Sequence, residues 1–277
     1  MSGITREATA ADLPWVAPAA LHAHLVADTG ELVAISESEP WRVRVTERGE
    51  AALLGRWREH LDYVAVLGLW CAPARVPFLV TDLIEVARMQ GFGRLLGPLV
   101  PGSQAGPYLQ AGLRVVERVD VLRLERPARA VVLPPPAGVT MREAVAADLD
   151  VITRIDRVSF PGFWRYDDSQ LARLLDAGRG ALAEEEGRAI GYTLATVSGG
   201  ESSLGRLAVV PGNRRHGVGT ALAAEAVAWL AGRGARAVTL STQSDNEASQ
   251  HLYRRLGFRR LPETLVACAS GPLTAPH

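Results

Sequence analysis

The fold of this chain follows from residues 206–220, which read RLAVVPGNRRHGVGT. An apolar run typical of a strand ends before Pro211, a basic loop with glycines follows, and an alanine-rich helix begins at Gly219. Gly217 and Gly219 carry no Cβ, so the backbone there can approach a ligand closely. The N–H groups and the dipole at a helix start attract anions. The stretch therefore predicts a strand–loop–helix cradle for a pyrophosphate.

Two commoner phosphate-binding loops do not fit this stretch. A P-loop ends in Gly-Lys-Ser/Thr, and this chain contains no lysine. A dinucleotide fingerprint requires G-x-G-x-x-G, and only the G-x-G of Gly217 and Gly219 is present. Taken alone, that G-x-G is equally compatible with an ordinary tight turn between a strand and a helix. The residues that follow decide between the two interpretations.

Residues 245–258, DNEASQHLYRRLGF, make the pattern specific. Together with Arg214-x-x-Gly217-x-Gly219, they resemble the GNAT superfamily of acyl-coenzyme A-dependent N-acyltransferases. The arginine and the two glycines match the superfamily's pyrophosphate loop. Its second motif is matched by Asn246, Ala248, Tyr253, Gly257 and Phe258. The resemblance covers about residues 139–268.

The resemblance implies a role for each matching residue, with acetyl-coenzyme A as the cosubstrate. Leu207, Ala208 and Val209 pair through their backbone with the pantetheine arm, at a point where the sheet of the superfamily splays. Asn246 hydrogen-bonds the pantetheine region, and Tyr253 protonates the departing thiolate. Backbone N–H groups hold the pyrophosphate; they belong to Arg215, His216, Gly217, Val218, Gly219 and Thr220.

The sequence offers a candidate for the general acid of the reaction but no clear candidate for the general base. A phenol on a fixed helix is a reasonable general acid, although Tyr253 is also compatible with a purely core position. The superfamily's enzymes that acetylate protein N-termini carry a glutamate five residues before the motif asparagine, where this chain has Ser241. Asp245, Glu201 and the run 184–186 are alternative carboxylates, and each also fits a solvated surface position. We assign no base.

The segment 160–168, FPGFWRYDD, is aromatic for a loop. Its Phe160-Pro161 pair resembles the same segment of the bacterial enzymes that acetylate protein N-termini. In those enzymes this loop borders the acceptor site. Exposed aromatic side chains often anchor a ligand. We therefore expect Phe160, Trp164 and Tyr166 to contact the acceptor. The alternative is that Phe163 and Trp164 pack against the other half of the chain.

The two halves of the chain resemble each other. Residues 5–13, TREATAADL, match residues 141–149, MREAVAADL, at seven of nine positions. Weaker matches follow in the same order, as expected for a duplication. Three prolines near the middle predict an extended linker. We expect a domain over residues 1–130, a linker over 131–138 and a catalytic domain over 139–277, at roughly 100–200 residues per domain.

The first half lacks the cradle. When Pro73 is aligned with Pro211, the loop after it is about four residues shorter and contains no glycine. Pro77 also lacks an N–H group of the kind that such a cradle uses. No asparagine motif precedes Tyr108, which corresponds to Tyr253. The first half is predicted to be a degenerate copy that keeps the fold and binds no cofactor.

Composition restricts the remaining possibilities. The chain has 277 residues, 48% apolar and 22% charged, with a formal net charge of zero. Neither of its two cysteines belongs to a metal-binding motif, and no apolar run is long enough to cross a membrane. We expect a cytoplasmic monomer that binds no nucleic acid, membrane or metal.

These observations lead to one fold class and one main function. We expect an α/β protein with two GNAT-like domains in tandem, each a mixed twisted sheet flanked by helices. The second would move an acetyl group from acetyl-coenzyme A to a primary amine, either a peptide or protein N-terminus or a small metabolite amine. The alternative is a non-catalytic module that binds acyl-coenzyme A or a protein partner.

Overall fold

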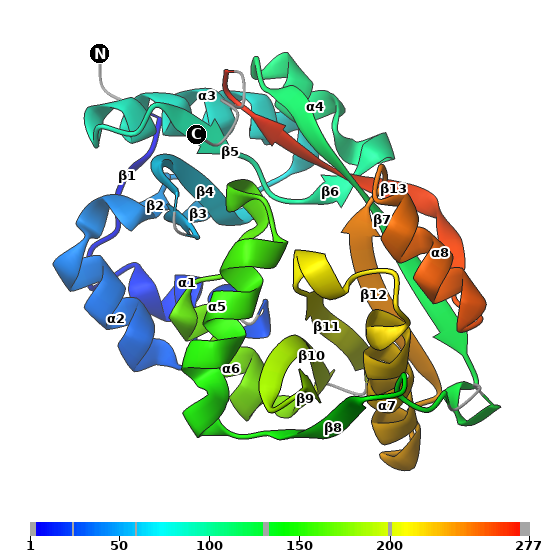
Figure 1. Cartoon of the computed structure of the whole chain (residues 1–277). Helices are drawn as coiled ribbons and strands as arrows, with labels where there is room; N and C mark the ends of the chain where they lie inside the picture. Colours follow the sequence, from blue (N-terminus) through cyan, green and yellow to red (C-terminus); the bar gives the residue numbers. More distant parts are fainter. Residues whose placement is uncertain (1–3, 24, 59, 130–132, 199–200, 272–277) are drawn as a thin grey trace. The chain divides into compact units, whose positions relative to one another are not determined.

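The computed structural model describes residues 4–23, 25–58, 60–129, 133–198 and 201–271. The chain forms two compact units (Figure 1). Unit 1 contains residues 1–118 and 265–275, and unit 2 contains residues 119–264. The predicted boundary at 131–138 stays a prediction, because each unit takes residues from both sides of it, and residues 131 and 132 lie outside the described part.

Unit 1 is a mixed sheet with helices packed on it. Its sheet order is β1-β2-β3-β4-β5-β13, with β6 also paired to β13; β4 and β5 are parallel and the other pairs are antiparallel. The strands are β1 Arg6–Glu7, β2 Val43–Val45, β3 Ala51–Trp57, β4 His60–Trp70, β5 Arg94–Leu96, β6 Val100–Pro101 and the last part of β13 Arg259–Ala269. The helices are α1 Leu13–His22, α2 Thr29–Ser38, α3 Val76–Met89 and α4 Gly106–Gln110.

Unit 2 has a sheet of the same kind, ordered β8-β9-β10-β11-β12-β7. Among the described strand pairs of this sheet, β11 and β12 are parallel and the others are antiparallel. The strands are β8 Val139–Ala144, β9 Gly178–Glu185, β10 Arg188–Ser198, β11 Glu201–Val209, β12 Ala237–Gln243 and the last part of β7 Arg114–Glu125. The helices are α5 Leu149–Ser159, α6 Asp168–Asp176, α7 Val218–Gly232 and α8 Glu247–Arg255.

The sheets of the two units correspond strand by strand. In both, four antiparallel-connected strands are followed by a parallel neighbour and a last antiparallel strand. That last strand is exchanged: β7, which ends the first half of the sequence, closes the sheet of unit 2, and residues 265–269 of β13 pair within unit 1. The predicted fold class, two mixed α/β sheets in tandem with flanking helices, is confirmed.

A repeated ion pair supports the duplication at atomic detail. Arg6 binds both carboxylate oxygens of Asp12, at 2.7 and 2.9 Å, and Arg142 binds both of Asp148, at 2.8 Å each. In each copy the arginine also donates to the carbonyl of the next residue, at 3.1 Å. The two R-E-A-x-A-A-D-L segments therefore form the same turn, held by the same side chains.

Two layers of helices enclose the sheet of unit 2. The apolar side chains of α7 pack on β9, β10 and β11, through a core that includes Val218, Leu222 and Val209. The side chains of α5 and α6 pack with a different set of strand residues, including Leu182 and Tyr192. Because neighbouring strand residues point to opposite faces, these two cores lie on opposite sides of the sheet.

Candidate active site

The predicted cradle lies between the end of β11 and the start of α7. A single 3₁₀ turn, Pro211–Asn213, follows the strand, and four further residues lead into the helix. Arg215 and Gly217 have positive φ angles of 65° and 87°. This alternation of backbone conformation turns successive N–H groups toward the same side, as in anion-binding nests. Glycine takes the second of the two positions without a steric penalty.

The N–H groups of this loop are available to a ligand. Within the part of the chain that the structure describes, those of residues 215–220 donate no hydrogen bond, and the first N–H bond of α7 is from Ala221 to the Gly217 carbonyl, at 3.0 Å. Residues 215–217 are exposed. Six consecutive free donors at the positive end of a fifteen-residue helix form a site for a polyanion.

Arg214 holds the loop in place. Its guanidinium donates to the carbonyl oxygens of Val209, at 3.0 Å, and Ser159, at 2.9 Å. These two bonds tie the loop to the end of β11 and to the end of α5. The sequence motif identifies Arg214 as part of the loop, and its two hydrogen bonds show how it fixes the loop. Arg215 is exposed and leaves its charge facing solvent.

Beside the cradle, β11 and β12 separate. Their only registered pair is Ser203 with Thr239, although β11 continues to Val209 and β12 to Gln243. On its other side β11 stays paired with β10 up to Val209. The edge of β11 at Leu207, Ala208 and Val209 is thus unpaired toward β12, the place where the sequence analysis expects an extended ligand. The carbonyl of Val209 is occupied by Arg214.

Tyr253 lies on α8 in an apolar setting. The side chain is 6% exposed, and its ring meets Phe258 edge-on at 5.6 Å between centroids. Burial raises the pKa of the phenol above its ordinary value. Among the described residues no group hydrogen-bonds its hydroxyl. Tyr253 therefore combines the packing of a core residue with a hydroxyl that stays protonated and has no partner in the described part of the chain.

Asn246 caps α8. Its side-chain oxygen accepts from the Ser249 N–H at 3.1 Å, which satisfies a donor of the first helical turn. The side-chain NH₂ group makes no bond among the described residues. Asn246 is thus both a structural cap and a donor available to a ligand, so the two interpretations of this residue are compatible.

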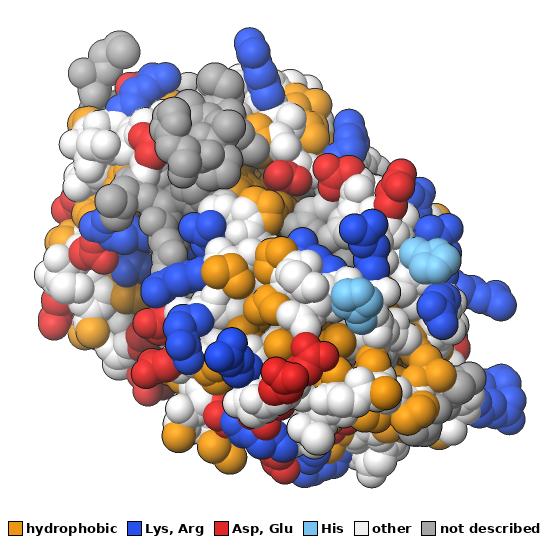
Figure 2. All heavy atoms as spheres, in the orientation of Figure 1, with side chains coloured by type: hydrophobic (Ala, Val, Ile, Leu, Met, Phe, Trp, Pro, Cys, Tyr) orange, Lys and Arg blue, Asp and Glu red, His pale blue; other side chains and the backbone are white. Residues whose placement is uncertain are grey.

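Basic side chains surround this region. Exposed arginines and histidines gather over α8 and the start of α7 (Figure 2); they are Arg215, His216, His251, Arg254 and Arg255. Such a surface attracts a ligand that carries several phosphate charges. Neither His216 nor His251 lies in a buried setting typical of a catalytic residue.

The alternative carboxylates are mostly engaged elsewhere. Glu184 accepts from Arg142 at 2.9 Å, and Glu185 accepts from Asn213 at 2.8 Å. Glu186 and Asp245 are exposed. The side chain of Glu201 lies outside the described part of the structure. The described side chains therefore add no stronger candidate for a general base.

The aromatic loop is organised by residues that the sequence analysis missed. Arg206, 7% exposed, forms a bidentate ion pair with the fully buried Asp156, at 2.7 and 3.0 Å. Its guanidinium carbon lies 3.5 Å from the Phe160 ring centroid and 4.0 Å from that of Tyr166. The three predicted acceptor residues, Phe160, Trp164 and Tyr166, are each half-buried. The structure brings them together around one cation.

The signal for this cluster was in the sequence. Asp156 follows Ile152 by four residues, so it lies on the apolar face of α5. Arg206 opens the apolar end of β11. A carboxylate on a core-facing stripe and an arginine in a buried strand each require a partner, because an unpaired buried charge is costly. Pairing the two would have linked α5, β11 and the loop.

A second missed residue is Asp120, on β7. Its fully buried carboxylate accepts from Ser244 and Thr264, each at 2.9 Å, from Arg260 at 3.2 Å and from Gln250 at 3.3 Å. Gln250 belongs to α8, and Ser244 to the turn before it. Asp120 therefore anchors the helix that carries Tyr253, although it comes from the first half of the sequence.

Unit 1 has no comparable cradle. Its helix α3 begins directly after the 3₁₀ turn Pro73–Arg75, so the four residues that form the loop in unit 2 have no counterpart. Arg75 instead binds Glu50 at 2.8 and 3.2 Å. These hydrogen bonds lower the pKa of the Glu50 carboxyl, although its burial acts in the opposite direction. An ion pair thus closes the turn that is open in unit 2.

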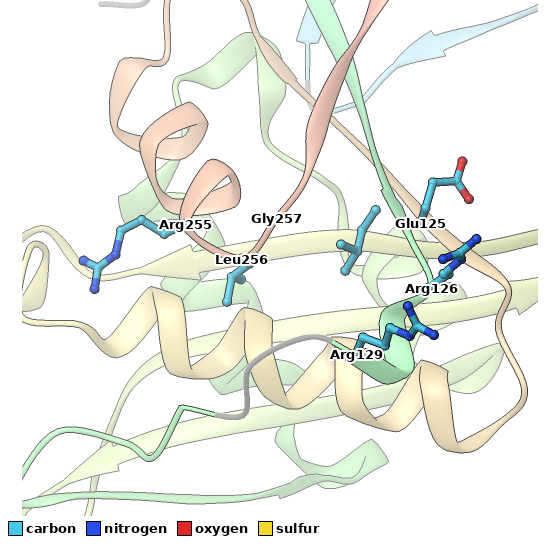
Figure 3. Close-up of a pocket in the computed structure, with 7 residues that line it drawn as sticks. Glu125, Arg126, Arg129, Arg255, Leu256 and Gly257 are labelled. Carbon is cyan, nitrogen blue, oxygen red and sulfur yellow. The ribbon is translucent and has the colours of Figure 1, made fainter.

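A pocket of about 220 Å³ lies elsewhere in unit 2 (Figure 3). It is lined by the end of β7, the turn after it and the end of α8; the residues are Leu124, Glu125, Arg126, Arg129, Arg255, Leu256 and Gly257. Figure 3 shows the Arg255 side chain directed away from Arg126 and Arg129. None of the predicted site residues lines it. Among the described residues, no group of three His, Cys, Asp or Glu side chains is placed to hold a metal ion.

Comparison with known sequences places part of unit 2 in a family match. Residues 149–258 match the Acetyltransferase (GNAT) family. A mycothiol acetyltransferase of Clavibacter michiganensis is 35% identical over 135 residues, which are 46% of this chain and 44% of that protein. One of Tsukamurella paurometabola is 28% identical over 203 residues, covering 65% and 68%. The chain thus spans less than half the length of the Clavibacter relative.

Solved structures show the same fold. A GCN5-related N-acetyltransferase from Sphaerobacter thermophilus has a TM-score of 0.66 and 19% identity, covering 99% of this chain and 98% of that one. A tandem GNAT protein from the clavulanic acid biosynthesis pathway has a TM-score of 0.62 and 17% identity, covering 84% and 83%. The described residues include no helix that is both long and apolar enough to span a membrane.

Proposed function

We propose, on the premise that residues 149–258 form a domain of the acetyltransferase (GNAT) family, that the chain transfers an acetyl group from acetyl-coenzyme A to a primary amine. The observation that carries this proposal is the row of six N–H groups at residues 215–220, which donate no hydrogen bond among the described residues. A row of this length at a helix start matches the two linked phosphates of coenzyme A. The residues present therefore fit the cosubstrate.

Each part of the cosubstrate has a matching feature in unit 2. The cradle holds the pyrophosphate through its backbone, from Arg215 to Thr220. The unpaired edge of residues 207–209 binds the pantetheine amides, and the free NH₂ group of Asn246 adds a donor. Bound in this way, the cosubstrate supplies an acetyl group activated as a thioester.

The chemistry requires one proton to be accepted and one to be donated. The neutral amine attacks the thioester carbonyl, the C–S bond breaks, and the thiolate takes a proton. Tyr253 donates that proton, because its raised pKa keeps the phenol protonated over the working range. Positioned proton transfer of this kind contributes roughly 10²–10⁴-fold to the rate. The proton of the attacking amine leaves through water.

The acceptor is an amine of low pKa. At pH 7.5 about one lysine side chain in a thousand is neutral, compared with about a quarter of α-amines. Ser241 stands where a base would be, so a lysine-like amine would stay protonated. The names of the mycothiol acetyltransferase relatives favour a small-molecule amine. The aromatic loop 160–166 favours a peptide α-amine as the second candidate, since rings can contact a first side chain.

Unit 1 is a degenerate copy with a structural role. It shares the strand order of unit 2 and has a closed turn where unit 2 has its cradle. We therefore infer one acetyl-coenzyme A site per chain, which isothermal titration measures directly as a stoichiometry of one. A stoichiometry of two would contradict the assignment. The monomeric state and the cytoplasmic location stay predictions.

An acceptor screen tests the proposal. The full chain is incubated with acetyl-coenzyme A and with peptides and small amines in parallel, and the released thiol is measured. We expect release that depends on at least one low-pKa amine. Acetyl-coenzyme A binding without release from any acceptor would identify a non-catalytic module instead. Efficient acetylation of lysine side chains in peptides with blocked N-termini would overturn the acceptor assignment.

A further inference from the structure

We infer that Arg206 and Asp156 form a buried latch that fixes the loop 160–166 in one conformation and thereby sets the affinity for the acceptor. The inference rests on the proposed function, because the loop is the proposed acceptor contact. It assigns a role to two residues that lie in neither motif. Both are positioning residues, since they act through the loop.

The latch grips the loop at three points. Arg206 Nη2 donates to the Trp164 carbonyl at 2.6 Å, and Asp156 Oδ1 accepts from the Tyr166 N–H at 3.1 Å. The guanidinium carbon lies over the rings of Phe160 and Tyr166, at 3.5 and 4.0 Å from their centroids. The loop is therefore held through its backbone and through two of its side chains, all by one ion pair.

The latch is itself rigid. The Tyr192 hydroxyl donates to Asp156 Oδ2 at 2.5 Å, and Arg206 Nε donates to the same oxygen at 2.7 Å. Asp156 and Tyr192 are fully buried, and Arg206 is nearly so. Hydrogen bonds to ionised groups are about twice as strong as neutral ones, and low local polarity strengthens them further. The ion pair thus has one arrangement.

A strand irregularity aims the arginine at the loop. In the pairing of β10 with β11, Leu194 lies opposite Arg206 while Ala195 lies opposite Leu204, so Gly205 is an extra residue. This bulge places Leu204 in the core with α7 and Arg206 in the layer of α5. Without it, Leu204 and Arg206 would share a face. The bulge lies next to the residues proposed to bind the cosubstrate.

A substitution that keeps the charge isolates the latch. Lysine at position 206 stays paired with Asp156, but it cannot form the two-pronged contact or stack on the two rings as a guanidinium does. In Arg206→Lys we expect backbone amides of residues 160–166 to exchange hydrogen roughly tenfold faster, and the KM for the acceptor to rise roughly tenfold. The dissociation constant of acetyl-coenzyme A and the exchange of α7 should not change.

The matched control is Arg142→Lys. Arg142 also forms a bidentate pair with an aspartate of unit 2, Asp148, but does not contact the loop. We expect neither loop exchange nor acceptor KM to change in this variant. If Arg206→Lys does not fold, the double variant Asp156→Asn, Arg206→Gln removes both buried charges together, so neither is left unpaired. It should loosen the loop to a similar extent.

The two readouts separate the latch from the proposed function. Unchanged hydrogen exchange in the loop would overturn the latch, whether or not any acceptor is found. Faster exchange with an unchanged acceptor KM would overturn the link between the loop and the acceptor. An equal loss of acetyl-coenzyme A affinity would show that Arg206 holds β11 rather than the loop, and would also overturn the inference.

Discussion

Tyr253 shows how one residue can satisfy two requirements. Its ring packs with Phe258 in an apolar core, and its hydroxyl stays free of partners among the described residues. Burial raises its pKa, so the phenol is protonated at neutral pH and is a weaker acid than an exposed tyrosine. We expect Tyr253→Phe to lower kcat by roughly 10²-fold with the dissociation constant of acetyl-coenzyme A unchanged. Steady-state kinetics and calorimetry measure the two quantities.

The control for that variant is its thermal stability. Phenylalanine keeps the ring and its contacts, so the melting temperature should stay close to that of the unaltered chain. A normal kcat would show that Tyr253 is a packing residue and that the thiolate takes its proton from water.

The pH profile follows from the same residue. The proposed reaction needs a neutral amine and a protonated phenol. Because the pKa of Tyr253 lies above its ordinary value of 10, the phenol remains protonated while the amine loses its proton. The rate should therefore rise with pH along the titration of the acceptor and show no fall up to about pH 9. Acceptors of lower amine pKa should move the curve to lower pH by the same amount.

A different profile would identify another group. An inflection at a fixed pH, whichever acceptor is used, would indicate an enzyme base. The carboxylates of unit 2 would then be tested one by one, beginning with Asp245 and Glu201.

Single residues also mark the limit of sequence reasoning. Asn246 and Tyr253 were found because their spacing along one helix is a local pattern. Asp156, Arg206 and Asp120 were not, because their charged partners lie 50 residues or more away in the sequence. A lone charge in an apolar segment predicts that a partner exists and does not say which one.

At the scale of elements, the start of α7 carries the main argument. Aspartate at position 219 puts a negative charge among the free N–H groups, where it repels a phosphate. A negative charge near a helix start stabilises the helix, but the Cβ of residue 219 faces the apolar side chains of Leu252 and Val209, so the melting temperature is measured together with binding. We expect Gly219→Asp to weaken acetyl-coenzyme A binding by roughly 10²-fold or more. Calorimetry measures this loss.

Two further glycine variants distinguish the effect of the added charge in Gly219→Asp from the effect of its added side-chain volume. A Cβ at position 219 meets Leu252 Cδ1 at 3.1 Å and Val209 Cγ2 at 3.5 Å, so Gly219→Ala requires only a small shift of a leucine end. Gly232, at the other end of α7, has open space around it. Gly219→Ala should lose much less affinity, and Gly232→Asp none. Equal binding by Gly219→Asp and the unaltered chain would exclude the cradle as the site.

Elements were predicted well where local signals were strong. The cradle helix, expected to begin at Gly219, begins at Val218, and the strand before it ends at Val209. The bulge at Gly205 was missed, because a glycine within a strand does not show which neighbour is displaced. That one residue changes which side chains of β11 face α5. The contact between Arg206 and the aromatic loop therefore cannot be predicted from regular strand alternation.

At the scale of the whole molecule, the duplication was visible in the sequence and the exchange of last strands was not. Matching segments such as residues 5–13 and 141–149 predict two similar units. Which sheet a last strand joins depends on pairing across more than a hundred residues; β7 pairs with β12 through residues 119–125. Nothing in the local pattern of β7 distinguishes pairing with its own half from pairing with the other half.

The exchange makes a prediction about fragments. A fragment of residues 139–277 contains the whole predicted catalytic domain but lacks β7. It loses the buried Leu122 and Leu124, each contributing about 1.5–3 kcal/mol, and leaves the partners of Asp120 without their acceptor. That loss is comparable to the total stability of a domain, about 5–15 kcal/mol. The fragment should aggregate or melt without cooperativity.

A longer fragment is the matched test, because it changes only the strand in question. Residues 114–277 restore β7 and Asp120 while still omitting the cores built from α1, α2 and α3. We expect this fragment to melt cooperatively and to bind acetyl-coenzyme A more tightly than the fragment 139–277, since α8 regains its anchor. Asp120→Asn in the full chain should reproduce part of the defect, because an amide replaces one of the two acceptor oxygens. If the fragment 139–277 melts and binds like the full chain, β7 is dispensable, and the physical domain boundary lies at residues 131–138.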